Sequence, residues 1–275
     1  MKLQVVLPDE TAGADPRRLV DLARRAEDLG YDTAWLPDHV LPPDEYGPVH
    51  GGVFEPLVTL GWLAAATSRI RLGTSVLVLP LRSPFVVAKQ AATLHALSAG
   101  RFTLGVGIGW DAREFTAVGA DFDARAARTD EAIALLRHLF RVGRGPFEGR
   151  WYGFDAGVFE PRPAEGAVPV MTGGVSDAAL RRAARYADVW QGVGLDPVAF
   201  GERLARLRAR TGDRVVSPGT RLDWSAPGRT AGEAAGTAEA FRAAGAEHLA
   251  VHFGDPDTYA DRMTDFARAT RHCVG

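Results

Sequence analysis

The sequence has little of what marks several large classes of protein. Its one cysteine, Cys273, excludes an internal disulfide framework and a cysteine-based metal site, and is typical of a reducing compartment. With 32 basic and 34 acidic residues, its charge indicates neither a nucleic-acid nor a membrane surface. No apolar run reaches the roughly 18 residues of a membrane span, and no signal-peptide pattern opens the chain. We therefore expect a soluble, cytoplasmic protein whose partner is a small molecule.

Familiar catalytic signatures are missing as well. The chain has no Walker-type phosphate loop, no G-x-S-x-G nucleophile turn and no H-E-x-x-H zinc motif. Residues 105–109 read GVGIG, which spaces the glycines wrongly for the dinucleotide fingerprint G-x-G-x-x-G. None of these chemistries is indicated.

The clearest pattern lies between Ile70 and Trp110. Residues 70–79 are nearly all apolar and rich in β-branched side chains, which is typical of a strand covered on both faces. Pro84 opens a helix, and residues 101–109 form a second buried strand. A strand, a helix and a strand of these lengths predict a parallel sheet. Polar and glycine residues end both strands, where parallel α/β folds place their chemistry.

The same alternation fills the rest of the chain. Strands are predicted at 3–8, 33–40, 70–79, 101–109, 168–174, 187–193, 218–226 and 247–253. With a helix after each strand, these units favour an α/β (β/α)8 TIM barrel over an open doubly wound sheet. No change of composition marks a boundary, so we predict one domain over 1–275. Segments 41–52 and 143–163 are expected to be insertions at the C-terminal mouth of the barrel.

The pair Asp38-His39 ends the second predicted strand and should point into the mouth. A histidine there can donate or accept a proton near neutral pH, and Asp38 could orient its ring or bond a ligand. A hydrogen-bonded loop histidine explains the pattern equally well. His39 is our candidate catalytic residue, with that alternative open.

Glycine-rich strand ends supply further candidates. Gly105, Gly107 and Gly109 alternate along one strand, which allows either a ligand or a packed helix to approach the backbone. The turn TGGVS at 172–176 leads into a helix capped by Ser176, and its backbone N–H groups could hold a phosphate. An ordinary turn with a helix cap is the alternative.

A metal site has weaker support. His248, His252 and Asp255 gather near the last strand, but a third ligand with coherent geometry is not evident, so we predict no metal.

Trp110 follows a strand end and could wall a planar ligand, whereas Trp35 is expected in the core.

Long stretches of the chain resemble a known family. They read WLPDHV, RIRLGTSVLVLPLRSPFVVAKQAATLHALSAGRFTLGVGIGWDAREFTAVGADFDARAARTDEAI, VPVMTGGVSDAALRRAARYADVW and AGAEHLAVHF, in the family's order. On these residues the chain resembles the luciferase-like monooxygenase superfamily, in the group of oxidoreductases that use the deazaflavin coenzyme F-420. The resemblance implies a (β/α)8 barrel, a homodimer, and a flavin or deazaflavin in the mouth.

The resemblance also implies roles for single residues. His39 matches a histidine that donates a proton or stabilises charge on the cofactor ring, and Ser75-Val76 matches a non-prolyl cis peptide behind that ring. The residues matched to the cofactor site are Asp38, Thr74, Ser75, Val76, Ile108, Gly109, Trp110, Gly173, Gly174, Val175 and Ser176. Trp110 stands where the sugar-phosphate dehydrogenases of the group have glutamate, which argues against that activity.

The resemblance predicts hydride transfer between coenzyme F-420 and a small organic substrate, with His39 handling the proton. The first alternative is an FMN-dependent monooxygenase on the same barrel, and the second is a non-catalytic flavin-binding barrel. The sequence does not name the substrate. Its pocket is expected to draw on segments 41–52 and 143–163 and on the seventh strand, through Tyr46, His50, Trp151, Tyr152, Arg221, Asp223 and Trp224.

Overall fold

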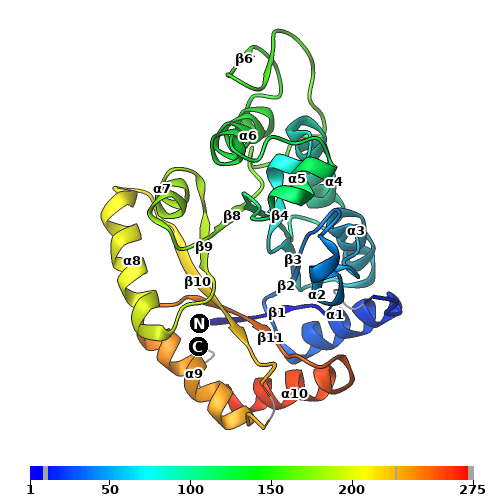
Figure 1. Cartoon of the computed structure of the whole chain (residues 1–275), viewed down its shortest axis with the longest axis vertical. Helices are drawn as coiled ribbons and strands as arrows, with labels where there is room; N and C mark the ends of the chain where they lie inside the picture. Colours follow the sequence, from blue (N-terminus) through cyan, green and yellow to red (C-terminus); the bar gives the residue numbers. More distant parts are fainter. Residues whose placement is uncertain (9–11, 227, 272–275) are drawn as a thin grey trace.

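The computed structural model describes residues 1–8, 12–226 and 228–271, so Cys273 lies outside the described residues. In this part of the chain, eight parallel strands form a closed barrel, and β11 pairs with β1 to complete the ring (Figure 1). The strands are β1(Lys2–Val6), β2(Thr33–Leu36), β3(Arg71–Thr74), β5(Phe102–Gly107), β8(Val170–Gly173), β9(Val189–Gly192), β10(Ser217–Asp223) and β11(His248–His252). The predicted (β/α)8 barrel is confirmed.

Helices follow the strands and surround the barrel in chain order (Figure 1). They are α1(Arg17–Leu29), α3(Pro56–Ala66), α4(Pro84–Leu97), α6(Arg125–Arg141), α7(Asp177–Tyr186), α8(Pro197–Thr211), α9(Ala231–Ala243) and α10(Tyr259–Ala269). Short elements join them: η1(Asp44–Tyr46), α2(Gly47–His50), β4(Leu77–Val78), η2(Leu79–Leu81), α5(Ala112–Ala117), β6(Phe147–Glu148), β7(Gly153–Phe154) and η3(Pro256–Thr258). The predicted strand at 70–79 is divided, because β3 ends at Thr74 and β4 begins only at Leu77.

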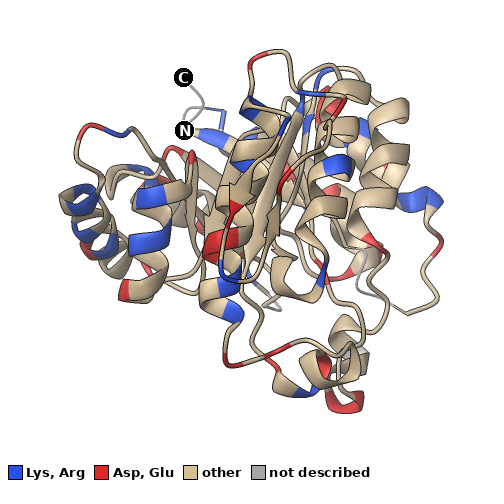
Figure 2. Cartoon of the chain, turned by 90° about the horizontal axis from the view of Figure 1, so that it is seen from above, with Lys and Arg blue, Asp and Glu red and all other residues tan. Residues whose placement is uncertain are grey.

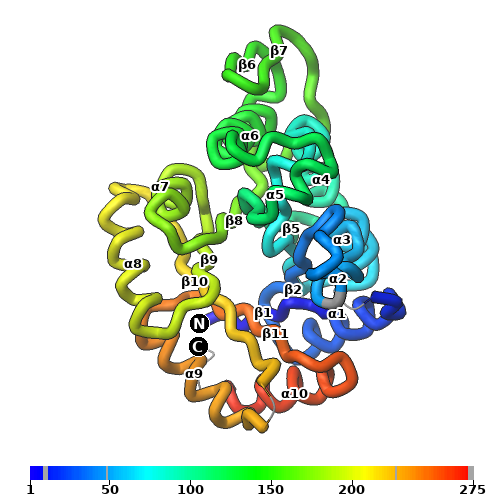
Figure 3. Tube along the Cα trace, in the orientation of Figure 1, coloured from blue at the N-terminus to red at the C-terminus, as the bar shows by residue number. Residues whose placement is uncertain are grey.

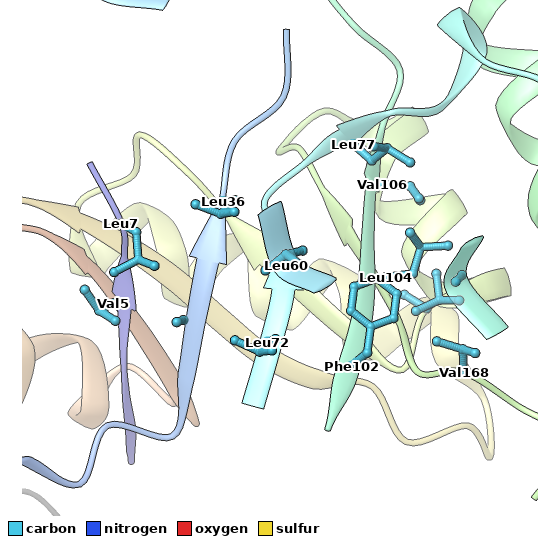
Figure 4. Packing of buried hydrophobic residues seen from close by; sticks show 14 of the residues in the cluster. Val5, Leu7, Leu36, Leu60, Leu72, Leu77, Phe102, Leu104, Val106 and Val168 are labelled. Carbon is cyan, nitrogen blue, oxygen red and sulfur yellow. The ribbon is translucent and has the colours of Figure 1, made fainter. Parts of the chain in front are cut away.

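Side chains along each strand alternate between the barrel interior and the helices. Those facing the helices form the main core, of which Figure 4 shows a part between β1, β2, β3, β5 and α3. The labelled members are Val5, Leu7, Leu36, Leu60, Leu72, Leu77, Phe102, Leu104, Val106 and Val168. A smaller cluster of Val6, Trp35, Met171 and Ala250 lies on the opposite face of the strands, inside the barrel.

Trp35 fills much of the barrel interior. It is 2% exposed, and its indole N–H donates to the side-chain oxygen of Gln4 at 2.9 Å. A Cβ added to Gly73 would lie 2.2 Å from the indole ring, so the glycine makes the room that the ring occupies. The predicted core position of Trp35 is confirmed.

The two predicted insertions lie in different places. Segment 41–52 follows β2 and stands at the mouth, as predicted, where the ring of Tyr46 contacts Trp110. The hairpin expected in 143–163 is present as β6 and β7, but the predicted place of this segment at the mouth is wrong. It follows α6 and packs against the outside of the helix ring, beyond the barrel (Figure 3).

Contacts with α4 and α6 explain the position of the segment 143–163. The ring of Phe154 lies 5.8 Å from that of Phe85 in α4. The Glu131 carboxylate in α6 accepts the backbone N–H groups of 150–152 at 2.7 to 2.9 Å. The aromatic rings and backbone N–H groups of segment 143–163 therefore find their partners on α4 and α6, away from the mouth.

Charged residues of both signs are interspersed over the helices (Figure 2). None of the described helices is both long enough and apolar enough to span a lipid bilayer.

Candidate functional site

A bulge between β3 and β4 forms the floor of the mouth. The Ser75-Val76 peptide bond is cis, which confirms the prediction for this bond. A Cβ on Gly105 would lie 1.8 Å from the carbonyl oxygen of Thr74, and one on Gly107 would lie 2.4 Å from Val76. These two glycines of β5 therefore admit the bulge itself, rather than a ligand or a helix, at close range.

The third glycine of the run has a different use. Gly109 has φ +75°, and a Cβ there would lie 2.6 Å from the ring of Phe115 and 2.8 Å from Val78. The group that approaches Gly109 closely is therefore the helix α5. Of the two alternatives predicted for these glycines, a ligand or a packed helix, the helix is found here. Ile108 is half-buried beside it, and Trp110 beyond it is 49% exposed.

Thr74 and Ser75 are both engaged with neighbouring strands. The Thr74 hydroxyl donates to the carbonyl oxygen of Gly105 at 2.6 Å and accepts its N–H at 3.0 Å. The Ser75 hydroxyl donates to the side-chain oxygen of Gln191 at 2.7 Å. These bonds fix the bulge between β5 and β9, and contact of either residue with a cofactor ring stays a prediction.

Asp38 anchors the segment that follows the bulge. Its two carboxylate oxygens accept the guanidinium of Arg82 at 2.7 and 2.8 Å, and one also accepts the N–H of Val78 at 2.8 Å. Burial raises the pKa of Asp38, although the Arg82 charge and these hydrogen bonds oppose the shift. Asp38 thus serves Arg82 and Val78 and not, as suggested, the ring of His39, and its contact with a ligand stays a prediction.

Glu114 orients His39 instead. Its carboxylate lies 3.2 Å from Nδ1 of His39 and accepts the N–H groups of Val40 and Leu41 at 2.7 and 3.1 Å. Burial alone would raise the pKa of Glu114, but the His39 hydrogen bond and the two N–H bonds outweigh it and lower the pKa. The ionised carboxylate therefore accepts from Nδ1–H and leaves Nε2 of His39 for other partners.

Glu114 was not predicted from the sequence. The residue stands three positions after Asp111, which is the pattern of a helix cap, and Asp111 does cap α5 by accepting the N–H of Arg113 at 2.8 Å. The glutamate does not complete this cap and reaches across to residues 39–41, which follow β2. Only the burial of its charged side chain would have marked Glu114 as a functional residue, and burial cannot be seen in the sequence.

Aromatic rings surround His39 at the mouth. Its ring stacks on that of His50 with centroids 4.5 Å apart, and the ring of Trp110 approaches edge-on at 6.0 Å. Tyr46 packs on Trp110 from η1 at 4.8 Å. An ion pair of 2.8 Å between Arg113 and Glu45 holds η1 against α5. His39 and Trp110, predicted separately, are thus brought together.

The turn after β8 adjoins the bulge. A Cβ on Gly173 would lie 3.4 Å from Val76, an ordinary contact that leaves the surface open. Gly174 has φ +105°, and the indole N–H of Trp190 donates to its carbonyl at 2.8 Å. Val175 is half-buried and follows directly.

Ser176 begins α7 as predicted. Its hydroxyl accepts the N–H of Ala179 at 3.2 Å, which confirms the predicted cap. The other N–H groups of the first turn have no partner within the helix, as at any helix start. Phosphate binding by the turn at 173–176 stays a prediction.

A hollow of about 690 Å³ opens beside the aromatic rings. The expected pocket residues His50, Arg221 and Asp223 line it. Trp224 does not, because it is 3% exposed and packs between α10 and β11. Trp151 and Tyr152 are also placed elsewhere, on the outside of α6, so the pocket is less aromatic than predicted.

The histidines of β11 are held by hydrogen bonds at opposite ends of the strand. Nδ1 of His248 lies 3.1 Å from the Gln4 amide, whereas Nδ1 of His252 accepts the N–H of Gly254 at 3.3 Å. Over residues 1–8, 12–226 and 228–271, no group of three or more histidine, cysteine or acidic residues could hold a metal ion.

Comparisons with known proteins define the family. The family model described as luciferase-like monooxygenase matches residues 1–220. An uncharacterized protein of Mycobacterium tuberculosis is 37% identical over 202 residues, 69% of each chain. An F-420-dependent glucose-6-phosphate dehydrogenase of Kineococcus radiotolerans is 40% identical over 189 residues, which cover 66% of this chain and 54% of that relative.

Solved structures resemble the chain over nearly its full length. One is an F-420-dependent secondary alcohol dehydrogenase, at a TM-score of 0.83 and 18% identity, covering 98% of this chain and 99% of that one. Another is a monooxygenase from Streptomyces bottropensis, at a TM-score of 0.85 and 18% identity, covering all of both chains. At these identities the likeness concerns the fold alone. The family model, the sequence relatives and the barrel together show that the chain belongs to the luciferase-like monooxygenase family.

Proposed function

We propose that this protein is an oxidoreductase that binds coenzyme F-420 in the barrel mouth and transfers hydride between it and a small organic substrate. The observation that carries the proposal is the ring of His39, fixed by the buried Glu114 carboxylate and placed beside Trp110 at the mouth. The relatives named F-420-dependent, up to 40% identical, support the choice of cofactor.

The residues at the mouth fit a flat ring with a phosphate tail. Val76 lies on the floor between Gly107 and Gly173, and neither glycine carries a side chain that would cover it. Trp110 stands exposed at one edge of the floor, and the turn at 173–176 offers backbone N–H groups at the other. The bulge at 75–76 would then support the ring from behind, and Ile108, Gly109 and Trp110 would form the adjacent edge.

The chain would bind and orient both reactants and move one proton. A bound deazaflavin supplies a carbon that accepts or releases hydride. Nδ1–H of His39 is committed to Glu114, so Nε2 is the atom that gives or takes the accompanying proton. The Glu114 carboxylate would hold the ring of His39 in the orientation and tautomer that this transfer needs. Asp38 and Arg82 hold the bulge in place and take no proton in this scheme.

Titration of the purified protein with coenzyme F-420 and with FMN tests the proposal, with quenching of tryptophan fluorescence as the readout. We expect saturable quenching by F-420. Tight binding of FMN alone would favour the FMN-dependent monooxygenase, and binding of neither would leave a barrel without this cofactor.

Two glycine variants test where the cofactor lies. Gly173→Val places methyl groups on the floor of the mouth and should lower F-420 affinity at least tenfold. In the control Gly61→Val, nothing lies within 4 Å of the added Cβ, and affinity should not change. Equal affinity in both variants would contradict this placement.

The homodimer implied by the family resemblance, the cytoplasmic location and the single domain over 1–275 stay predictions. Light scattering of the purified protein would decide the first.

A further inference from the structure

Arg221 lies in the hollow beside the His39 site without a partner for its charge. Its register partner across β10 and β11 is Ala250, a member of the interior cluster, so the Arg221 side chain leaves the strand on the inward face. It is half-buried and lines the hollow of about 690 Å³. No described residue forms a hydrogen bond or ion pair with its guanidinium.

The other charged or titratable side chains named for this wall have partners. Arg229 donates to the Asp223 carbonyl and to Thr237, and His252 lies 3.8 Å from the Asp223 carboxylate. The Asp196 carboxylate accepts the N–H of Ala199, and the Asp223 carboxylate accepts the hydroxyl of Ser225. Arg229 is thus held in place through two of its N–H groups, and Arg221 is the arginine of this wall to which no described residue is bonded.

The hollow borders the His39 site through one ring, that of His50. His50 lines the hollow, and its ring stacks at 4.5 Å on that of His39. The remaining wall is largely apolar, with Val193, Leu195 and Phe241 among its residues. A molecule bound to the guanidinium would thus place an apolar body along this wall, toward His50 and the His39 ring on which His50 stacks.

From these observations we propose that Arg221 binds the carboxylate of the substrate, so that the substrate class is an organic acid with an apolar or aromatic body. This inference rests on the proposed function. A guanidinium matches a carboxylate through two parallel N–H bonds. A phosphate monoester carries nearly two charges at neutral pH, whereas the described residues of the wall include no lysine, and the second arginine, Arg229, is held by the Asp223 carbonyl and Thr237.

Benzoate and its neutral counterpart benzamide test the proposal by calorimetric titration, with inorganic phosphate as a third probe. The variants are Arg221→Gln and Arg221→Lys, and the control is Arg208→Gln, which removes the same charge from an exposed site on α8. We expect benzoate to bind the wild type and the control. Arg221→Gln should weaken it at least tenfold, Arg221→Lys less, and benzamide should bind all forms equally weakly.

Several outcomes would overturn the proposal. They are absence of benzoate binding to the wild type, equal benzoate affinity in Arg221→Gln, and tighter binding of phosphate than of benzoate. Loss of F-420 affinity in Arg221→Gln without benzoate would assign the guanidinium to the cofactor. Because the benzoate titration also runs on cofactor-free protein, it gives its answer even if the F-420 titration refutes the proposed function.

Discussion

Replacement of Glu114 by glutamine tests how His39 is set for proton transfer. In the wild type, one oxygen of the Glu114 carboxylate accepts two backbone N–H groups and the other accepts Nδ1–H of His39. A glutamine that keeps its carbonyl on Val40 and Leu41 must turn its NH₂ group toward Nδ1. His39 can accept that bond only by moving its proton to Nε2, so the variant inverts the tautomer.

The size of the effect follows from the loss of the atom that is placed for proton transfer. Glu114 lies 3.2 Å from Nδ1 of His39 and fixes which ring nitrogen carries the proton. A positioned acid or base contributes about 10²- to 10⁴-fold to a rate. With the tautomer inverted and the ring still in place, turnover should fall by about a hundredfold, the lower end of that range. Because the glutamine retains both backbone bonds, stability should fall by only about 1 to 2 kcal/mol.

Glu131 provides the matched control for this experiment. Its carboxylate also accepts backbone N–H groups, those of 150–152, but no described histidine is bonded to it, and it lies on α6 against segment 143–163. Glu131→Gln should cost similar stability and leave turnover unchanged. The tautomer of His39 is read by nitrogen NMR of labelled histidine, and turnover by the absorbance of F-420. An unchanged tautomer in Glu114→Gln, or equal turnover in the two variants, would refute the reasoning.

Three further predictions concern proton transfer, the bulge and acid stability. His39→Ala should retain F-420 affinity and lower turnover about 10²- to 10⁴-fold, and unchanged turnover would remove His39 from the mechanism. Gly105→Ala drives a Cβ to 1.8 Å from the Thr74 carbonyl and should cost about 3 kcal/mol in urea unfolding, whereas Gly236→Ala, in open space on α9, should be neutral or slightly stabilising. Burial opposes ionisation of Glu27, but three backbone N–H bonds from the segment before β3 hold its pKa at about 2, so ionised Glu27 contributes about 3 kcal/mol above pH 4.5. This contribution should fall as the pH drops from 4.5 through 2, and Glu27→Gln should remove that part of the pH dependence in unfolding measured across this range.

Local patterns predicted the elements of the fold because their causes are local. The apolar runs of the strands, Pro84 at the start of α4 and Ser176 at the start of α7 act within a few residues of the chain. The order of strands then follows from repetition of the unit, and eight such units close into a barrel whose helices cover the outer face while side chains fill the interior.

Segment 143–163 shows where local reading fails. Its glycines, prolines and aromatic residues correctly predicted a hairpin, because a tight reversal depends on nearby residues. Its place was predicted wrongly because that depends on which helices offer partners. Phe85 and Glu131 supply them on α4 and α6, and both precede the hairpin in the chain. Chain order alone also argues against the mouth, since a segment after a helix starts at the far end of the strands.

The candidate site, too, was predictable only where its features depend on nearby residues of the chain. The positions of His39 and Trp110 follow from strand ends, but the assignment of carboxylates to partners depends on contacts 40 to 75 residues apart in sequence. Asp38 is adjacent to His39 and yet serves Arg82, since both residues follow the end of β2 at Leu36 and their side chains reach different segments. Glu114 reaches His39 because the short helix α5 packs on Gly109, where a side chain would keep it away. The same glycine-rich strand end therefore admits both the bulge behind the predicted cofactor ring and the helix that orients the predicted proton donor.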